Sequence, residues 1–204
     1  MRKRLILALI FFFVSLAVSA QGLYFDIGFG AGLGWTKIDG ENMTDRLESS
    51  NDMAFSVGGK AGYGPFGSIP LYATAEFSGI GHRIFNGSNN IQLTSFILGP
   101  GVLFYPIPLI QIGMSMGYSF VSNQTDIQGL EMYKSKGGYA YNWSVAFDLG
   151  KGNHGCLIGF TYYGAVNKLE TLNVNQNSSM VGIFGKYTFR QKAPSLFKNA
   201  QTCT

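Results

Sequence analysis

Apolar residues occupy every second position over long segments of this 204-residue chain. The row that runs from Leu23 to Trp35 reads Leu, Phe, Ile, Phe, Ala, Leu, Trp, and the interleaved row from Tyr24 to Thr36 reads Tyr, Asp, Gly, Gly, Gly, Gly, Thr. A helix would scatter the apolar residues around its circumference, whereas a β-strand places them all on one face. We therefore predict a strand with one apolar and one small or polar face.

The same period of two recurs in seven further segments. The expected strands cover residues 53–64, 70–83, 91–105, 109–121, 139–149, 156–167 and 179–190. They are about 11 to 16 residues long, longer than the ~5–6 residues of most strands in soluble proteins and sufficient for the ~9–11 that a tilted strand needs to cross a bilayer. The segment 91–105 is apolar on both alternate rows, so its facing stays open.

The connections between these segments alternate in length. Short ones are expected at 65–69, 106–108 and 150–155, longer polar ones at 39–52, 122–138 and 168–178, and a modest one at 86–90. Lipid offers no hydrogen-bond partners, so a membrane-spanning sheet must close on itself. The pattern predicts an all-β fold, an eight-stranded antiparallel up-and-down transmembrane β-barrel, with short periplasmic turns, long outer loops and both termini in the periplasm.

The first twenty residues have the layout of a secretory signal peptide. Arg2, Lys3 and Arg4 precede an apolar run, and Val18-Ser19-Ala20 offers a cleavage site before Gln21. We expect a signal peptide over 1–20, a barrel over 21–190 and a short periplasmic tail over 191–204. Without the three basic residues the net charge falls from +4 to +1 (12 basic against 11 acidic residues), so nucleic acid is not expected as a partner.

The last expected strand ends in an aromatic pattern, Met180-Val-Gly-Ile-Phe-Gly-Lys-Tyr-Thr-Phe189. With the eight alternating segments, it resembles the small outer-membrane barrel superfamily that includes the OmpA transmembrane domain, OmpX and OmpW. The resemblance covers residues 21–190 and implies that Tyr187 and Phe189 form a signal for the barrel-assembly machinery. In the family the terminal aromatic usually ends the chain, whereas here Arg190 to Thr204 follow as a tail expected to be disordered.

Five charged residues lie on the small or polar rows of the expected strands. If the apolar rows face lipid, these side chains point into the lumen; they are Asp26, Lys60, Glu76, Asp148 and Lys186. Their distances from the turns place Asp26 beside Lys186 and Lys60 beside Glu76. We interpret them as a lumenal charge network that plugs the barrel, with a proton or ion path as the alternative. The resemblance implies lumenal ion pairs of the same kind.

Aromatic residues gather near the ends of the expected strands. Such rings anchor membrane proteins at headgroup depth. We predict interfacial positions for Trp35, Tyr63, Tyr105, Tyr118 and Tyr141.

Three functions remain open at this stage. The first, which we favour, is a non-enzymatic outer-membrane protein whose loops contact a host or the environment, or which supports envelope integrity. The second is a narrow channel for small hydrophobic molecules, as in OmpW-like proteins, and the third is a lipid-modifying enzyme. His82, with Ser78, Ser88 and Glu76 in reach, is the only candidate for the third, and it lacks a compact catalytic signature, so we expect no enzyme.

The remaining expectations concern partners and ligands. The first long connection carries five acidic residues against Arg46 alone, a net charge of −4 that could attract a cation or a basic host protein. We expect outer-membrane lipid as a partner, a host or environmental ligand at the long loops as an open alternative, and a monomer. No cofactor and no metal site are expected, and Cys156 and Cys203 are expected to be unpaired.

Overall fold

The computed structural model describes residues 22–46, 52–66, 69–86, 89–125, 135–150, 152–170 and 174–191. The expected signal peptide and nearly all of the expected tail lie outside these ranges. The elements, in chain order, are β1 (Leu23–Ile38), β2 (Glu41–Asn42), α2 (Met43–Arg46), β3 (Met53–Tyr63), β4 (Leu71–Asn86), β5 (Asn89–Ile107), β6 (Ile110–Thr125), β7 (Ser135–Asp148), β8 (His154–Leu169) and β9 (Asn175–Arg190).

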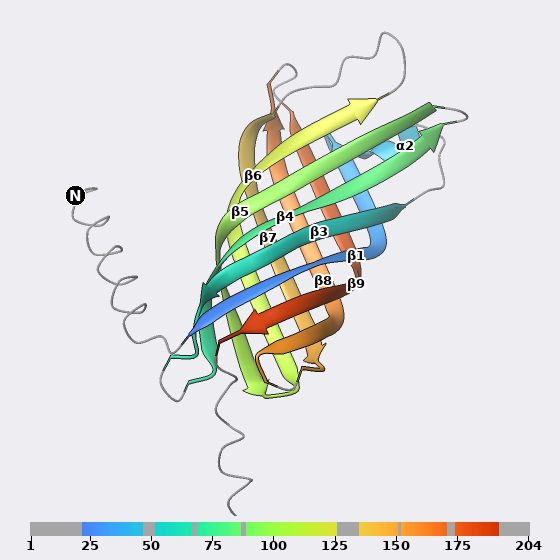
Figure 1. Cartoon of the computed structure of the whole chain (residues 1–204). Helices are drawn as coiled ribbons and strands as arrows, with labels where there is room; N and C mark the ends of the chain where they lie inside the picture. The colour runs from blue at the N-terminus through green and yellow to red at the C-terminus, as the bar shows by residue number, and fades with distance from the viewer. Residues whose placement is uncertain are drawn as a thin grey trace, which may run out of the picture.

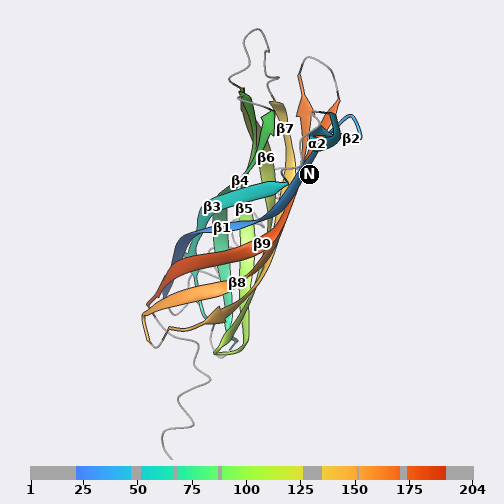
Figure 2. The same cartoon turned by 90° about the vertical axis from the view of Figure 1, so that its right-hand side faces the viewer.

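Eight of the nine strands form a closed antiparallel barrel (Figure 1). Each strand pairs with its neighbour in sequence, and β9 pairs with β1 to close the wall, so β9 lies between β8 and β1 in Figure 2. The two-residue β2 only extends the end of β1. This confirms the predicted eight-stranded up-and-down transmembrane barrel.

The pairing register tilts the strands around the barrel. Following paired residues once around the wall from Gly28 leads back to β1 at Ile38, ten residues further along (38 minus 28). Such a stagger forces the strands to lie obliquely to the barrel axis, and eight strands enclose an interior that side chains can fill.

The outer surface of the barrel is apolar over most of its height. The alternating row of β1 includes Phe29, which is 75% exposed. Exposed apolar residues are also present on each of the other seven barrel strands, among them Phe160 at 66% and Ile183 at 60%. A soluble protein rarely shows an apolar surface of this extent, and the surface is the belt expected of a lipid-facing barrel wall. Among the described residues, no helix is long and apolar enough to cross a membrane.

The strands reach further toward the loop end than the alternation predicted. β6 continues to Thr125 and β8 to Leu169, and the pairing of β4 with β5 extends to Asn86 and Asn89. Polar residues replace the apolar row in these extensions while the pairing continues, so hydrophobic alternation alone could not reveal them. The short helix α2 was likewise not predicted.

Glycines on the inner row of β1 allow a close approach across the closing seam. A Cβ atom on Gly28 or on Gly32 would collide with a main-chain carbonyl of β9, of Gly185 and Val181 respectively. These glycines therefore serve barrel closure, since any side chain there would push β1 away from β9.

Candidate functional site

The lumen is filled by layers of side chains, and the layer nearest the short turns combines aromatic rings with an ion pair. We call it the turn-end cluster; it comprises Tyr24, Tyr72, Tyr105, Gln111, Asp148 and Arg190, all at most 3% exposed. Asp148 forms a two-pronged ion pair with Arg190, in which Nη2 donates to Oδ1 over 3.0 Å. Tyr105 donates to the other carboxylate oxygen over 3.0 Å. This geometry holds both charges with nearly full hydrogen bonding.

Two residues of this cluster correct the sequence-based predictions. Tyr105 is fully buried in the lumen and accepts a hydrogen bond from Gln111 over 2.6 Å, so its predicted interfacial position is wrong. The reason is that β5 is apolar on both rows, which left its facing undetermined. Arg190 ended the expected strand 179–190 but was also grouped with the tail that follows Phe189; it is the last residue of β9, on the inward row that contains Lys186 and Thr188.

The next layer toward the loops holds the remaining predicted lumenal charges. We call it the ion-pair layer; it comprises Asp26, Lys60, Glu76 and Lys186. Lys186 Nζ lies 3.0 Å from Asp26 Oδ1, and Lys60 Nζ lies 3.2 Å from Glu76 Oε2. The second pair is a charge contact without hydrogen-bond alignment. The structure thus brings together the two pairs that the distances from the turns predicted.

Glu76 is also held by neutral donors. Ser78 Oγ and Asn142 Nδ2 each donate to Glu76 Oε1 over 2.6 Å. Asn142 in turn accepts a hydrogen bond from Thr161. With Asp148 and Arg190, the described lumenal charges comprise three acids and three bases, so the interior is neutral overall.

A small cavity borders the ion-pair layer. It is lined by Glu76, Ser78, Asn142, Tyr163 and Lys186, among others, and has a volume of about 30 Å³. That is room for one or two water molecules and too little for an organic solute.

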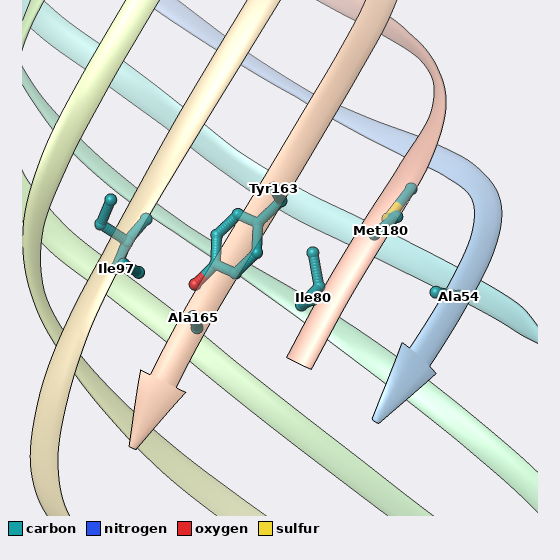
Figure 3. Packing of buried hydrophobic residues seen from close by; sticks show 7 residues of the cluster. Ala54, Ile80, Ile97, Tyr163, Ala165 and Met180 are labelled. Atoms are coloured by element: carbon teal, nitrogen blue, oxygen red, sulfur yellow. The ribbon is translucent and has the colours of Figure 1, made fainter. Parts of the chain in front are cut away.

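Above the cavity the lumen becomes apolar (Figure 3). The side chains of this apolar layer are at most 2% exposed; they are Ala54, Ile80, Ile97, Ala140, Tyr163, Ala165 and Met180. The inward rows of the strands are therefore not uniformly small and polar, as the sequence had suggested. An apolar layer across the lumen excludes water and ions because neither finds a polar partner there.

The loop end of the lumen closes with amide and hydroxyl groups. Asn167 donates to Ser119 Oγ over 3.0 Å, and Asn123 donates to Gln176 over 2.7 Å. Beside them Met43 of α2 packs on a buried apolar cluster formed by Ile84, Ile91 and Leu93. The short helix thus covers part of the barrel mouth.

The candidate catalytic histidine is part of this filling. His82 is 1% exposed, and its Nδ1 lies 3.4 Å from Thr36 Oγ1. Ser78 is four residues away on the same strand, about 13 Å at the usual rise, and it donates to Glu76. A nucleophile and its base need to be within ~3 Å of each other, so Ser78 and His82 do not form such a pair; Ser88 lies outside the described residues. Among the described residues, no group of three or more His, Cys, Asp or Glu is placed to hold a metal ion.

The other predicted aromatics lie on the outer wall. Tyr63 and Tyr118 are about half exposed, at 50% and 55%, while Trp35 and Tyr141 are half-buried among outward-facing neighbours. Their function as interfacial anchors stays a prediction.

The expected assembly signal also faces outward. Tyr187 Oη lies 2.5 Å from His154 Nδ1, and the ring of Phe189 lies 5.3 Å from the same imidazole. His154 therefore packs against both residues of the last strand. Cys156, two residues further on, is exposed and free, and Cys203 lies outside the described residues.

Comparison with known proteins identifies solved structures that share this architecture. No protein-family model and no curated protein sequence matches the chain. Among solved structures, the attachment invasion locus protein Ail of Yersinia pestis, in complex with the heparin analogue sucrose octasulfate, is similar with a TM-score of 0.52 and 17% identity, over 81% of this chain and 98% of Ail. Neisserial surface protein A is similar with a TM-score of 0.50 and 15% identity, over 82% of this chain and 96% of the other. The chain has the fold of the small eight-stranded outer-membrane β-barrels.

Proposed function

We propose that this protein is a non-enzymatic outer-membrane barrel that displays its long-loop end at the cell surface for contact with a host or with the environment. The observation that carries the proposal is the sealed lumen. Three ion pairs, an apolar layer and a polar mouth follow one another along the barrel axis. With the interior fully used for packing, the surfaces left for specific contacts are the outer wall and the loop end.

The loop end offers more exposed polar structure than the turn end. β5 and β6 pair up to Ile91 and Thr125, and β1 folds back through β2 into α2. Asp39, Glu41 and Asp45 of this region are exposed to solvent. The paired strand extensions and α2 form an ordered structure from which the loops project. Loops positioned by a rigid scaffold often carry binding residues, which supports a binding function for this end of the barrel.

Two structural neighbours support the proposal at the level of fold. One of them carries attachment and invasion in its name, and it was solved with a sulfated sugar. We propose the same broad class of surface contact for this chain. Because Asp39, Glu41 and Asp45 make the described part of this surface acidic, the first probe to apply is a basic host protein.

The direct test uses intact cells that produce the protein. We expect protease to cut within residues 41–50, and we expect these cells to attach to surfaces coated with a basic protein and to epithelial surfaces several-fold better than cells without the protein. A variant with a glycine-serine linker in place of 41–50 should lose the attachment, while a variant with the periplasmic turn 66–69 replaced should keep it. Heat-modifiable gel migration checks that both variants are folded. Protection of the loops from protease on intact cells would overturn the proposal.

The conduit alternative is tested by conductance. The 30 Å³ cavity and the apolar layer provide no continuous water path among the described residues. We therefore expect no reproducible single channels from refolded wild-type protein in planar bilayers. Channels of stable amplitude would favour transport over surface contact.

A further inference from the structure

The charged residues on the outward rows of the barrel strands are unevenly distributed. Within the described part of the chain, these rows carry Lys37, Arg83 and Lys168 and no acidic residue, and a further exposed cation, Lys136, lies at the irregular start of β7. Lys37, Arg83 and Lys168 each project outward because both of their neighbours in sequence are at most 9% exposed and face the lumen. All three lie near the loop ends of their strands, just beyond the apolar belt.

Two of these cations belong to one continuous surface on β8, β9 and β1. Lys168 pairs with Asn175, and Lys37 pairs with Asn177, on rungs of β9 that are two residues apart. All four side chains are exposed. We call this surface the lysine–asparagine row; from strand spacing and rise, its two lysines lie roughly 12 Å apart.

The row itself presents two ammonium groups and two amides, while Glu41 and Asp45 line a shallow pocket on the β2–α2 side of Lys37. Within the described residues, neither lysine takes part in an ion pair. A third exposed cation, Lys136, precedes the residue that pairs with Lys168. Lysine ammonium groups bind phosphate as point charges, and asparagine amides can donate to its remaining oxygens.

Apolar residues lie directly below the row on the same strands. Trp35 precedes Lys37 on the outward row of β1, followed downward by Leu33, which is 64% exposed. On β9 the outward row continues to Val181 and Ile183, which are 46% and 60% exposed. A ligand that occupied both surfaces would need an anionic head and long apolar tails.

We propose that the lysine–asparagine row binds the phosphate groups of a phosphorylated glycolipid in the outer leaflet of the membrane. The acyl chains of that lipid lie along the wall of β1 and β9 beneath the row. The inference rests on the proposed orientation, with the loop end outside, because that leaflet is the one that the row would meet in the cell.

The test measures binding of defined lipids to purified, folded protein in neutral detergent. The probes are diphosphorylated lipid A, the same lipid without phosphates, and glucosamine phosphate without acyl chains. Each basic side chain near an anionic headgroup contributes about a fivefold factor in affinity, so we expect the double variant Lys37→Gln/Lys168→Gln to bind diphosphorylated lipid A about 25-fold more weakly. Arg83→Gln, the matched control, removes one cation at the same rim but on β4, and it should change the affinity by about twofold or less.

Three results would overturn the proposal. Equal affinity of wild-type protein for the dephosphorylated lipid would show that the phosphates are not recognised. Equal loss of affinity in Arg83→Gln would show unspecific attraction rather than a site on β8, β9 and β1. Equally tight binding of glucosamine phosphate would identify a soluble phosphosugar as the ligand in place of a lipid. None of these measurements depends on surface attachment by cells, so a failure here is distinct from a failure of the proposed function.

Discussion

The turn end and the middle of the lumen are both fully packed, but by opposite means. The turn-end cluster and the ion-pair layer bury six charged side chains in three ion pairs, two between neighbouring strands and one between β7 and β9. The side chains of the apolar layer above them carry a single polar group, the Tyr163 hydroxyl, which donates a hydrogen bond to the Ser95 carbonyl over 3.4 Å. A polar layer depends on the presence of every partner, whereas an apolar layer depends on filled volume. Substitutions in the two regions should therefore lower the free energy of unfolding for different reasons: loss of a charge partner in the polar layers, and loss of packed volume in the apolar layer.

The largest effect is expected from Asp148→Ala in the turn-end cluster. The change leaves the Arg190 guanidinium buried without its carboxylate, and loss of one partner of a buried pair costs about 3–5 kcal/mol. The free energy of unfolding, from urea titration in lipid vesicles followed by tryptophan fluorescence, measures the loss. The double variant Asp148→Ala/Arg190→Met should recover most of it, because no unpaired charge then remains. A double variant as unstable as the single one would contradict this account.

An intermediate effect is expected from Ile97→Ala in the apolar layer. Ile97 is fully buried, and truncation of such a residue costs about 2–4 kcal/mol because a cavity remains. The adjacent Leu98 faces the lipid and is 54% exposed on the barrel surface. Leu98→Ala is therefore a matched control that leaves no cavity and loses only the transfer free energy of the removed groups, about 1–2 kcal/mol. The same titration compares the two variants. Equal losses would mean that the two faces of β5 have been assigned the wrong way round.

The smallest effect is expected from Asp26→Asn in the ion-pair layer. The side chain of Lys186 is 14% exposed and borders the small cavity, so water can solvate its ammonium group when the carboxylate is gone. The substituted amide oxygen can still accept a hydrogen bond, and we expect a loss of about 1–2 kcal/mol. Lys60→Met should cost more, because it strands the carboxylate of Glu76, which is 1% exposed. Equal costs for the two changes would show that exposure of Lys186 is irrelevant.

Much of this architecture could be predicted from the alternation of apolar and polar residues and from the lengths of the connections between strands. Strand number, closure and the approach of Asp26 to Lys186 all follow from positions along tilted, paired strands. The apolar layer was missed although Ile80 continues the inward row of Glu76 and Ser78, so strict continuation of the row would have found it. The facing of β5 could not be predicted, because apolar residues on both rows remove the signal that distinguishes lipid from lumen.

The position of Arg190 has a consequence for the order in which the native contacts form. Its Nε donates to the carbonyl of Gly152 and its Nη2 to the carbonyl of Gly150, both in the turn that joins β7 to β8. That hairpin is synthesised about forty residues before Arg190, 38 in the case of Gly152, yet its turn lacks these donors until the final residue of β9 arrives. The β7–β8 hairpin is thus completed by the strand that finishes the wall, which links local turn geometry to the last step of closure.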